Sequence, residues 1–367
     1  MALVDLSDYG YVNARVRGMR SHFLTKKFFM QLVAASSFEE LHSLLEQTVY
    51  RRELNEAILV HPERPDYDQA LSLNLIAAFR KIYDSTGGEA HRLVMVLLSK
   101  YDLLNVKSVL RGKKGNATPS EITNLLIPVG SIRMDALEQM AQQREIRDVI
   151  NTMNGLQLKY ARPLLAAYPE FLKKDQDLAV LEVALDKFHY LNAMESLSGK
   201  GRYGKDKNVE MVREMISGEI DMKNISTLVR LRGLKLDDEE VENFRIPGGM
   251  LSEDQFLSLH RLGDIVQLVS EYPDPRYRRL LEKALSEYQE VDLVAFDREL
   301  EHELIRRAVA MSNVDVLSIG VIVGFLGAKE NEIINLRIVL KGKNMDQPQG
   351  DIKKDLFFVE RADAEAA

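Results

Sequence analysis

The stretch that comes closest to a chemical motif is Gly199–Asp206, which reads GKGRYGKD. It matches the G-x-x-x-x-G-K part of a phosphate-binding loop, whose backbone amides cradle the phosphates of a nucleotide. Asp206, however, stands where such loops carry the Ser or Thr that binds Mg²⁺, and its carboxylate would repel phosphate. A helical stretch at 189–197 also precedes the loop, where a buried strand is required. The sequence therefore favours a basic connecting segment, with a nucleotide-binding enzyme as an open alternative.

Other catalytic and metal-binding patterns do not form. The seven histidines contain no i, i+4 pair and no H-E-x-x-H; they are His22, His42, His61, His91, His189, His260 and His302. No Ser lies in a G-x-S-x-G elbow. The chain has no Cys, which excludes disulfides, thiolate nucleophiles and sulfur-ligated metals. We therefore predict no catalytic residue, no cofactor and no metal site.

The charge and hydropathy of the chain limit its partners. Its 367 residues carry 49 cations and 56 anions, mixed along the chain, for a net charge of −7. This balance offers no basic field to nucleic acid. The start contains Asp5 and Asp8 and no apolar run, so we expect no signal peptide and a cytoplasmic protein. The most apolar run, Val316–Leu326, is about half the length that spans a bilayer, and we interpret it as a buried core helix.

The strongest pattern is a ten-residue motif that occurs three times, at 102–111, 221–230 and 332–341. Each copy has an acid, an asparagine three residues later, a helical apolar pattern and a terminal cation. The acid and asparagine pairs are Asp102 with Asn105, Asp221 with Asn224, and Glu332 with Asn335. We expect each acid near the start of a helix and each cation near its end, where both charges oppose the macrodipole. Because buried polar groups need partners, we expect each asparagine to bond a neighbouring helix end in the same way.

The repetition extends beyond this motif. Thr118 and Asp237 each begin a capping box, and Ile127-Pro-Val-Gly matches Ile246-Pro-Gly-Gly. The first two copies keep one offset of 119 positions across the motif, the cap and the turn. After Gly342 nothing resembles the Ile-Pro-x-Gly turn, so we expect a truncated third copy. The sequence thus predicts an internal triplication with domains at 1–132, 133–251 and 252–367.

The long periodic segments all fit 3.6 residues per turn, and none alternates as a strand does. We therefore predict an all-α fold with three similar helical domains. Three unequal copies on one chain can close around a central opening and hold a coiled coil from three sides. Packed helices would supply the stiffness that such a socket needs.

Three groups of residues, taken in order, also carry a family resemblance. They are Gly10-Tyr11 with Val16-Arg17-Gly18, Thr48-x-Tyr50 with Leu54, and Lys329-Glu330-x-Glu332-x-x-Asn335. Together, on a triplicated helical chain, they resemble the C subunit of archaeal and bacterial V-type (A-type) ATPases, which is equivalent to the d subunit of the eukaryotic vacuolar proton pump. The resemblance runs from Tyr9 to Glu360. Arg51-Arg52 departs from it, and the tail from Arg361 matches nothing.

The resemblance implies a funnel of three helical domains around a pseudo-threefold axis. In that family the funnel sits on the cytoplasmic face of the membrane ring of proteolipid subunits, and its mouth receives the central stalk of subunits D and F. It is a rotor part of the ATPase or ATP synthase, which passes torque for ion transport and performs no chemistry. The resemblance therefore implies a non-catalytic subunit without a cofactor.

Two clusters of cations are candidates for contact with these partners. One is Arg15, Arg17 and Arg20 in a predicted N-terminal helix, and the other is Arg202, Lys205 and Lys207. No apolar periodicity nearby requires them, so we expect polar interface contacts, with an ordinary solvated face as the alternative. At the level of function, the alternative is a helical scaffold or adaptor unrelated to rotary ATPases.

Overall fold

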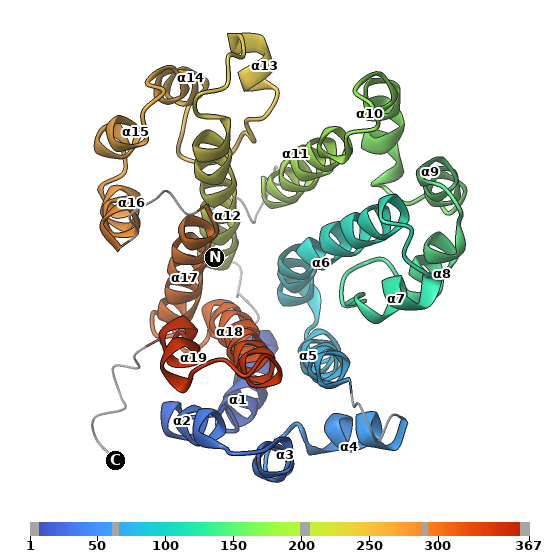
Figure 1. Ribbon diagram of the computed structural model, residues 1–367, viewed down its shortest axis with the longest axis vertical. Coiled ribbons are helices and arrows are strands. Elements are labelled where there is room, and N and C mark those ends of the chain that lie inside the picture. The colour runs from blue at the N-terminus through green and yellow to red at the C-terminus, as the bar shows by residue number, and fades with distance from the viewer. Residues whose placement is uncertain (1–6, 61–65, 199–205, 288–292, 360–367) are drawn as a thin grey trace. The chain divides into compact units, whose positions relative to one another are not determined.

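The computed structural model of the chain is built from α-helices (Figure 1). It describes residues 7–60, 66–198, 206–287 and 293–359, and within these ranges it contains nineteen helices and no strand. The all-α fold class predicted from the apolar spacing is therefore confirmed. No helix in the same ranges is both long and apolar enough to cross a membrane.

Packing divides the chain into two compact units. The first consists of residues 1–108, 118–138 and 305–367, and the second of residues 109–117 and 139–304. This division reflects contacts and not sequence repetition, so the three repeat domains at 1–132, 133–251 and 252–367 stay a prediction.

The first unit combines the two ends of the chain. Within it, α18 lies against α1, α2, α5 and α19, as the blue and red ribbons in Figure 1 show. Its helices are α1 (Ser7–Arg20), α2 (Lys26–Ala34), α3 (Phe38–Leu45), α4 (Arg51–Val60), α5 (Tyr67–Tyr83), most of α6 (Gly88–Lys114), α7 (Pro119–Asn124), the start of α8 (Met134–Gln142), the end of α17 (Leu293–Met311), α18 (Gly320–Asn344) and α19 (Gln349–Asp355).

The second unit contains the middle of the chain. One part of its core gathers the buried aromatic side chains Phe256, Tyr272, Tyr277 and Phe296. In another part, α11 packs against both α10 and α12. Its complete helices are α9 (Ile146–Gly155), α10 (Ala161–Lys173), α11 (Leu178–Leu197), α12 (Lys207–Leu231), α13 (Asp238–Glu242), α14 (Glu253–Arg261), α15 (Ile265–Glu271) and α16 (Pro275–Glu287).

A long helix followed by a short one occurs three times along the chain. The long helices α6, α12 and α18 have 27, 25 and 25 residues, and the short helices α7, α13 and α19 follow them. Each short helix buries one aliphatic side chain at the same distance from the motif acid, namely Ile122, Val241 and Ile352. The third copy therefore keeps its short helix, although its sequence lacks the Ile-Pro-x-Gly turn.

The motif acids do not lie where we expected them. Asp102, Asp221 and Glu332 are near the middle of α6, α12 and α18, not near the first turn. The apolar segments before each motif continue into it without a break, so one long helix forms and the macrodipole does not explain the acid. The cations are placed as predicted, since Arg111 and Arg230 lie in the last turn of their helices.

Helix starts follow the predicted capping in most places. The capping boxes at Thr118 and Asp237 both form with their glutamate partners. At α3, Ser37 accepts a hydrogen bond from the Glu40 amide, but the Glu40 carboxylate bonds Ser36 and not the backbone of Ser37. A capping box is therefore only half formed at α3. Such caps each stabilise a helix by about 1 kcal/mol.

The apolar run 316–326 is only partly a core helix. α18 begins at Gly320, and the residues from there to Leu326 are buried, whereas Val316 and Leu317 are 54% and 43% exposed. A Cβ on Gly320 would overlap the backbone of Met311 at the end of α17. The glycine therefore permits the close approach of α17 and α18.

Candidate functional site

The sequence stretch most like a nucleotide site does not have the structure of one. Residues 199–205, which include Arg202 and Lys205, lie outside the described part of the chain. A helix, α11, precedes them as predicted, where a phosphate-binding loop would follow a strand. Asp206 is the N-cap of α12 and accepts a hydrogen bond from the Asn208 amide at 2.7 Å. The Asp206 carboxylate thus stabilises the start of a helix.

The three motif asparagines make hydrogen bonds of one kind. Each side-chain amide donates to the carbonyl oxygen, and accepts from the backbone N–H, of a single residue 22 positions later. The distances are 2.7 to 3.0 Å, and the pairs are Asn105 with Ile127, Asn224 with Ile246, and Asn335 with Phe357. All three asparagines are at most 2% exposed. Each one therefore fixes the segment that follows a short helix onto the middle of a long helix.

Two of the motif acids hold the same segment four residues further along. Asp102 accepts hydrogen bonds from the Ser131 amide and hydroxyl and from the Ile132 amide, at 2.6 to 2.9 Å. Asp221 accepts one from the Met250 amide at 2.6 Å. Ser131 and Met250 both lie 29 positions after their acid. These charge-assisted bonds replace the hydrogen bonds with water that each carboxylate loses when it is buried.

Glycine is required beside both of these carboxylates. A Cβ on Gly130 would overlap the carboxylate of Asp102, and a Cβ on Gly249 would overlap that of Asp221. Neither glycine has a positive φ angle, so close approach and not backbone conformation requires them here. This gives a physical reason for the glycine that ends the Ile-Pro-x-Gly turn.

The third motif acid has different partners. Glu332 accepts hydrogen bonds from the Leu24 amide and the Tyr50 hydroxyl, both at 2.6 Å, and pairs with Lys329 at 3.1 Å. The side chains of Lys329 and Glu332 are each 4% exposed. Burial, together with the negative charge of Glu332, raises the pKa of Tyr50 well above its usual value. Burial lowers the pKa of Lys329, against the opposing effect of Glu332.

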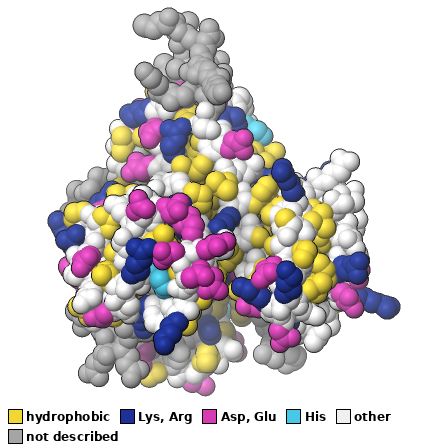
Figure 2. Space-filling view, turned by 90° about the horizontal axis from the view of Figure 1, so that it is seen from above, with side chains coloured by type: hydrophobic (Ala, Val, Ile, Leu, Met, Phe, Trp, Pro, Cys, Tyr) yellow, Lys and Arg dark blue, Asp and Glu magenta, His cyan; other side chains and the backbone are white. Residues whose placement is uncertain are grey.

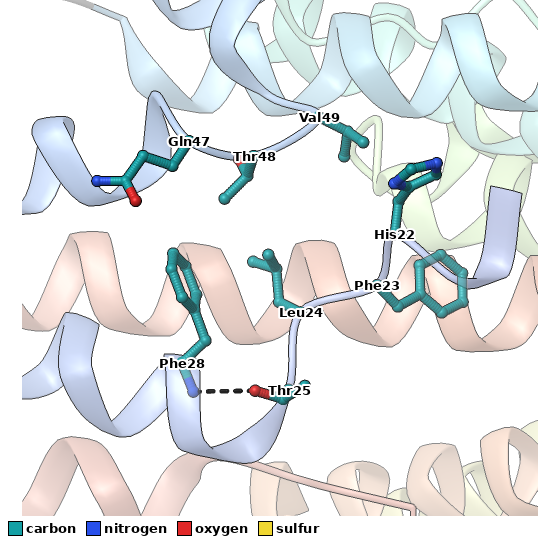
Figure 3. A pocket seen from close by; sticks show the side chains of 8 residues that line it. All are labelled: His22, Phe23, Leu24, Thr25, Phe28, Gln47, Thr48 and Val49. Atoms are coloured by element: carbon teal, nitrogen blue, oxygen red, sulfur yellow. Dashed lines mark hydrogen bonds between the residues drawn. The ribbon is translucent and has the colours of Figure 1, made fainter.

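A shallow pocket of about 500 Å³ lies beside this cluster, in the first unit (Figure 3). In Figure 3, Thr25 caps α2 by accepting a hydrogen bond from the Phe28 amide. The lining residues are His22, Phe23, Leu24, Thr25, Phe28, Gln47, Thr48 and Val49. They include neither a carboxylate nor a lysine or arginine, so the pocket offers little for chemistry. No group of three His, Cys, Asp or Glu residues in the described ranges could hold a metal ion.

Ion pairs connect each long helix to a helix that belongs to another of the three predicted repeats. The first runs from the first copy to the second, the next from the second to the third, and the last from the third to the first. They are Arg111 with Glu182 on α11, Arg230 with Asp297 on α17, and Arg337 with Asp68 on α5. Because at least one partner of each is well exposed, each contributes roughly 0–1 kcal/mol. Their order along the chain is more informative than their strength.

The predicted interface cations of the N-terminus all lie on α1. Arg15 and Arg17 are exposed, and Arg15 contacts the Tyr11 hydroxyl at 3.1 Å. Arg20 is half-buried and donates a hydrogen bond to the Ser312 hydroxyl at 3.0 Å. Arg20 therefore has a role within the chain, while Arg15 and Arg17 present their charges to the surface.

Of the second cation cluster, only Lys207 is described; it is exposed at the first position of α12. Lys207 belongs to the second unit, whereas α1 belongs to the first. Figure 2 shows one face of the molecule, on which acidic, basic and hydrophobic side chains are interspersed. Contact of any of these cations with a partner stays a prediction.

Comparison with known proteins identifies the family. A family model described as ATP synthase (C/AC39) subunit matches residues 12–354. The chain belongs to this family. It is similar to the C subunit of the A-type ATP synthase of Methanococcoides burtonii, with 28% identity over 93% of this chain and 92% of the relative. It is also similar to the subunits of that name from Haloferax volcanii, with 28% identity over 98% and 100%, and Methanocaldococcus jannaschii, with 26% over 93% and 84%.

Several residues of this C/AC39 family member have structural roles that their sequence pattern did not predict. Tyr50 and Lys329 were notable only for their family resemblance, yet both bond Glu332. A lysine in the middle of an apolar helix was the one available sign of a buried ion pair. The sequence did not indicate Phe357 as the partner of Asn335. The bonds are to the backbone of Phe357, so they do not depend on its residue type.

We predict that Asn224→Ala destabilises the protein by about 2–4 kcal/mol, because both the N–H and the C=O of Ile246 lose their partner in a buried site. Asn151→Ala, at an exposed position of α9, is the matched control and should have little effect. Urea unfolding measures both changes, and hydrogen exchange at the Ile246 amide should rise in the alanine variant. Equal stability of Asn224→Ala and wild type would contradict this role.

The raised pKa of Tyr50 predicts a loss of stability in alkali. Above about pH 10 the unfolded chain releases the tyrosine proton and the folded protein keeps it. The free energy of unfolding should therefore fall, by up to about 1.4 kcal/mol per pH unit for this group, until pH reaches the folded pKa. Tyr50→Phe should reduce that slope by the same amount.

Urea unfolding between pH 10.5 and 12 tests this, because the lowered pKa of Lys329 affects stability only below 10.5. Tyr190 contributes a similar slope, since burial and the nearby Glu219 raise its pKa as well. Tyr11→Phe, which alters an exposed ring, is the matched control. An unchanged slope in Tyr50→Phe would show that the hydroxyl is not held as described.

Proposed function

We propose that this chain is a non-catalytic central-stalk, or rotor, subunit of a V/A-type ATPase or ATP synthase. In this role it is a socket that couples a shaft of subunits D and F to the membrane ring of proteolipid subunits, and it transmits torque for ion transport. The observation that carries the proposal is a contact that occurs three times along the chain. In each case the side-chain amide of an asparagine bonds the backbone of the residue 22 positions later. It supports three similar helical domains, as a triplicated funnel requires.

The order of the ion pairs supports a closed arrangement of these domains. The pairs of Arg111, Arg230 and Arg337 connect the first copy to the second, the second to the third, and the third to the first. An open row of repeats would lack a contact of the last kind. A pseudo-threefold funnel with a central hollow is the arrangement that we infer from this order.

The polar residues of the repeat are used for structure, which supports a role without catalysis. Asp102 and Asp221 bond backbone amides, and the asparagines bond both groups of one peptide residue. Asp206 caps a helix. These bonds fix turns onto long helices, and a rigid body of this kind suits a part that must pass on torque without bending.

The place of the protein in the cell follows from the same proposal. We expect it on the cytoplasmic face of the membrane, as a peripheral part of the complex, in contact with subunits D and F and with the ring. A joint between separately folded parts is served by a polar, moderate interface. The mixed charges on the face in Figure 2 suit such a joint and do not suit nucleic acid.

Reconstitution of the purified chain tests this function. We expect it to bind both the D–F complex and the detergent-solubilised ring in pull-down and size-exclusion experiments, and to bridge the two in a ternary complex. Titration with Mg-ATP should give no binding heat. Failure to bind either partner would favour the alternative, a helical scaffold or adaptor whose role is unrelated to rotary ATPases. Binding of Mg-ATP would favour a nucleotide-binding enzyme.

The cations of α1 give a more specific prediction. The triple variant Arg15→Ala, Arg17→Ala, Arg20→Ala should weaken binding to the D–F complex or the ring by about fivefold, from roughly 0.5 kcal/mol for each of the exposed charges of Arg15 and Arg17. Far-UV circular dichroism should be unchanged. Because Arg20 also bonds Ser312, Ser312→Ala separates that internal contact from partner binding. Three other exposed arginines, Arg144, Arg147 and Arg162, serve as the matched alanine control. Unchanged affinity for both partners would dismiss the role.

A further inference from the structure

The third motif acid acts on a distant part of the chain. In the first two copies the acid bonds backbone amides 29 residues later, within its own repeat. Glu332 instead accepts hydrogen bonds from the Leu24 amide and the Tyr50 hydroxyl, which lie 308 and 282 positions earlier. The same position that elsewhere fixes a local turn here fixes the beginning of the chain onto α18.

Lys329 makes this site unlike the other two. Its ammonium donates to the Tyr50 hydroxyl at 2.7 Å, pairs with Glu332, and lies 4.2 Å from the centre of the Tyr50 ring. The residues three positions before the other acids are Ser99 and Gly218, which carry no charge. A buried charge pair is strongly destabilised when one partner is removed, because the other is left uncompensated. Tyr50, Lys329 and Glu332 therefore hold together only as a set, which we call the clasp.

Other polar contacts lie along the same junction, all within the first unit. The Asn13 amide donates to the carbonyl oxygens of Val316 and Ser318 at 3.1 and 2.9 Å. Glu330 bonds Lys100 and Tyr101 on α6, and Arg337 bonds Asp68 on α5. Between consecutive repeats the chain itself supplies a covalent link. This junction joins the last third of the chain to the first, so only non-covalent contacts close it.

We propose that the clasp is the closing device of this junction: it holds the N-terminal segment 9–25 on α18 and so keeps the shaft-binding hollow closed. The effect on shaft binding rests on the proposed function. The contact between segment 9–25 and α18, however, can be measured in the isolated chain. Loss of the clasp should release the N-terminal segment from α18 while the second unit stays folded. The affinity for the D–F shaft should then fall, because the socket can open.

The test compares Glu332→Gln with Asp221→Asn, the same change of chemistry in the second copy. In the isolated chain, hydrogen exchange of peptides from 9–25 and 320–335 should rise at least tenfold in Glu332→Gln. In Asp221→Asn the rise should be confined to the turn near Met250, whose amide the carboxylate holds. Tyr50→Phe, which removes one hydroxyl, should give a smaller rise at the same peptides and covers the case in which Glu332→Gln does not fold.

A cross-link then separates closure from general damage. The chain has no Cys, so Asp68→Cys with Arg337→Cys, two positions paired across the junction, can be joined by a short bismaleimide. We expect Glu332→Gln, or Tyr50→Phe in its place, to weaken D–F binding at least tenfold, and the cross-link to restore both affinity and slow exchange. Arg230→Cys with Asp297→Cys, cross-linked in the same way, is the matched control and should restore neither.

Each outcome decides between the two ideas. Unchanged exchange at 9–25 in both clasp variants, or weakened binding that the cross-link does not restore, would overturn the clasp. If the junction opens as expected but no form of the protein, wild type included, binds the D–F complex, the clasp stands and the proposed shaft function fails.

Discussion

The structure depends on one constraint: a buried asparagine side chain bonds both the backbone N–H and the C=O of a single residue in a turn. A turn that belongs to neither a helix nor a sheet leaves its N–H and C=O without partners, and burying them unbonded would be strongly unfavourable. The side chain of Asn224 presents the same donor and acceptor as a peptide, so it satisfies both groups of Ile246 at once. That contact fixes the turn after each short helix onto the long helix, and in the first two copies the neighbouring motif acid then requires the glycine.

Local features of the fold could be predicted from the sequence. The all-α class follows from apolar spacing, and the capping boxes at Thr118 and Asp237 follow from residue types three positions apart. The position of Asp102 in the middle of α6 was missed, because no Gly or Pro marks where the preceding segment joins the motif. The equivalence of Phe357 to Ile127 was missed for another reason. A hydrogen bond to a backbone does not restrict the side chain, so no residue type recurs.

The contacts of the candidate site were less predictable than the fold. Tyr50 and Glu332 are 282 positions apart, and periodicity along one helix says nothing about a partner at that distance. Only the lysine at 329, unusual in an apolar helix, hinted at a buried charge pair. The exposed cations Arg15 and Arg17 pose a different problem, since the groups that would explain them belong to other molecules.

The composition of the first unit has a consequence for biosynthesis. Its helices α1 to α5 leave the ribosome long before α18, on which they pack. At about 5–20 residues per second, the interval between Tyr50 and Glu332 lasts roughly 15 to 60 s. During that time the apolar surface that packs on α18 has no cover, whereas residues 109–117 and 139–304 can already complete the second unit. The first unit therefore stays incompletely packed until its last helices are made, and it is open to aggregation for that time.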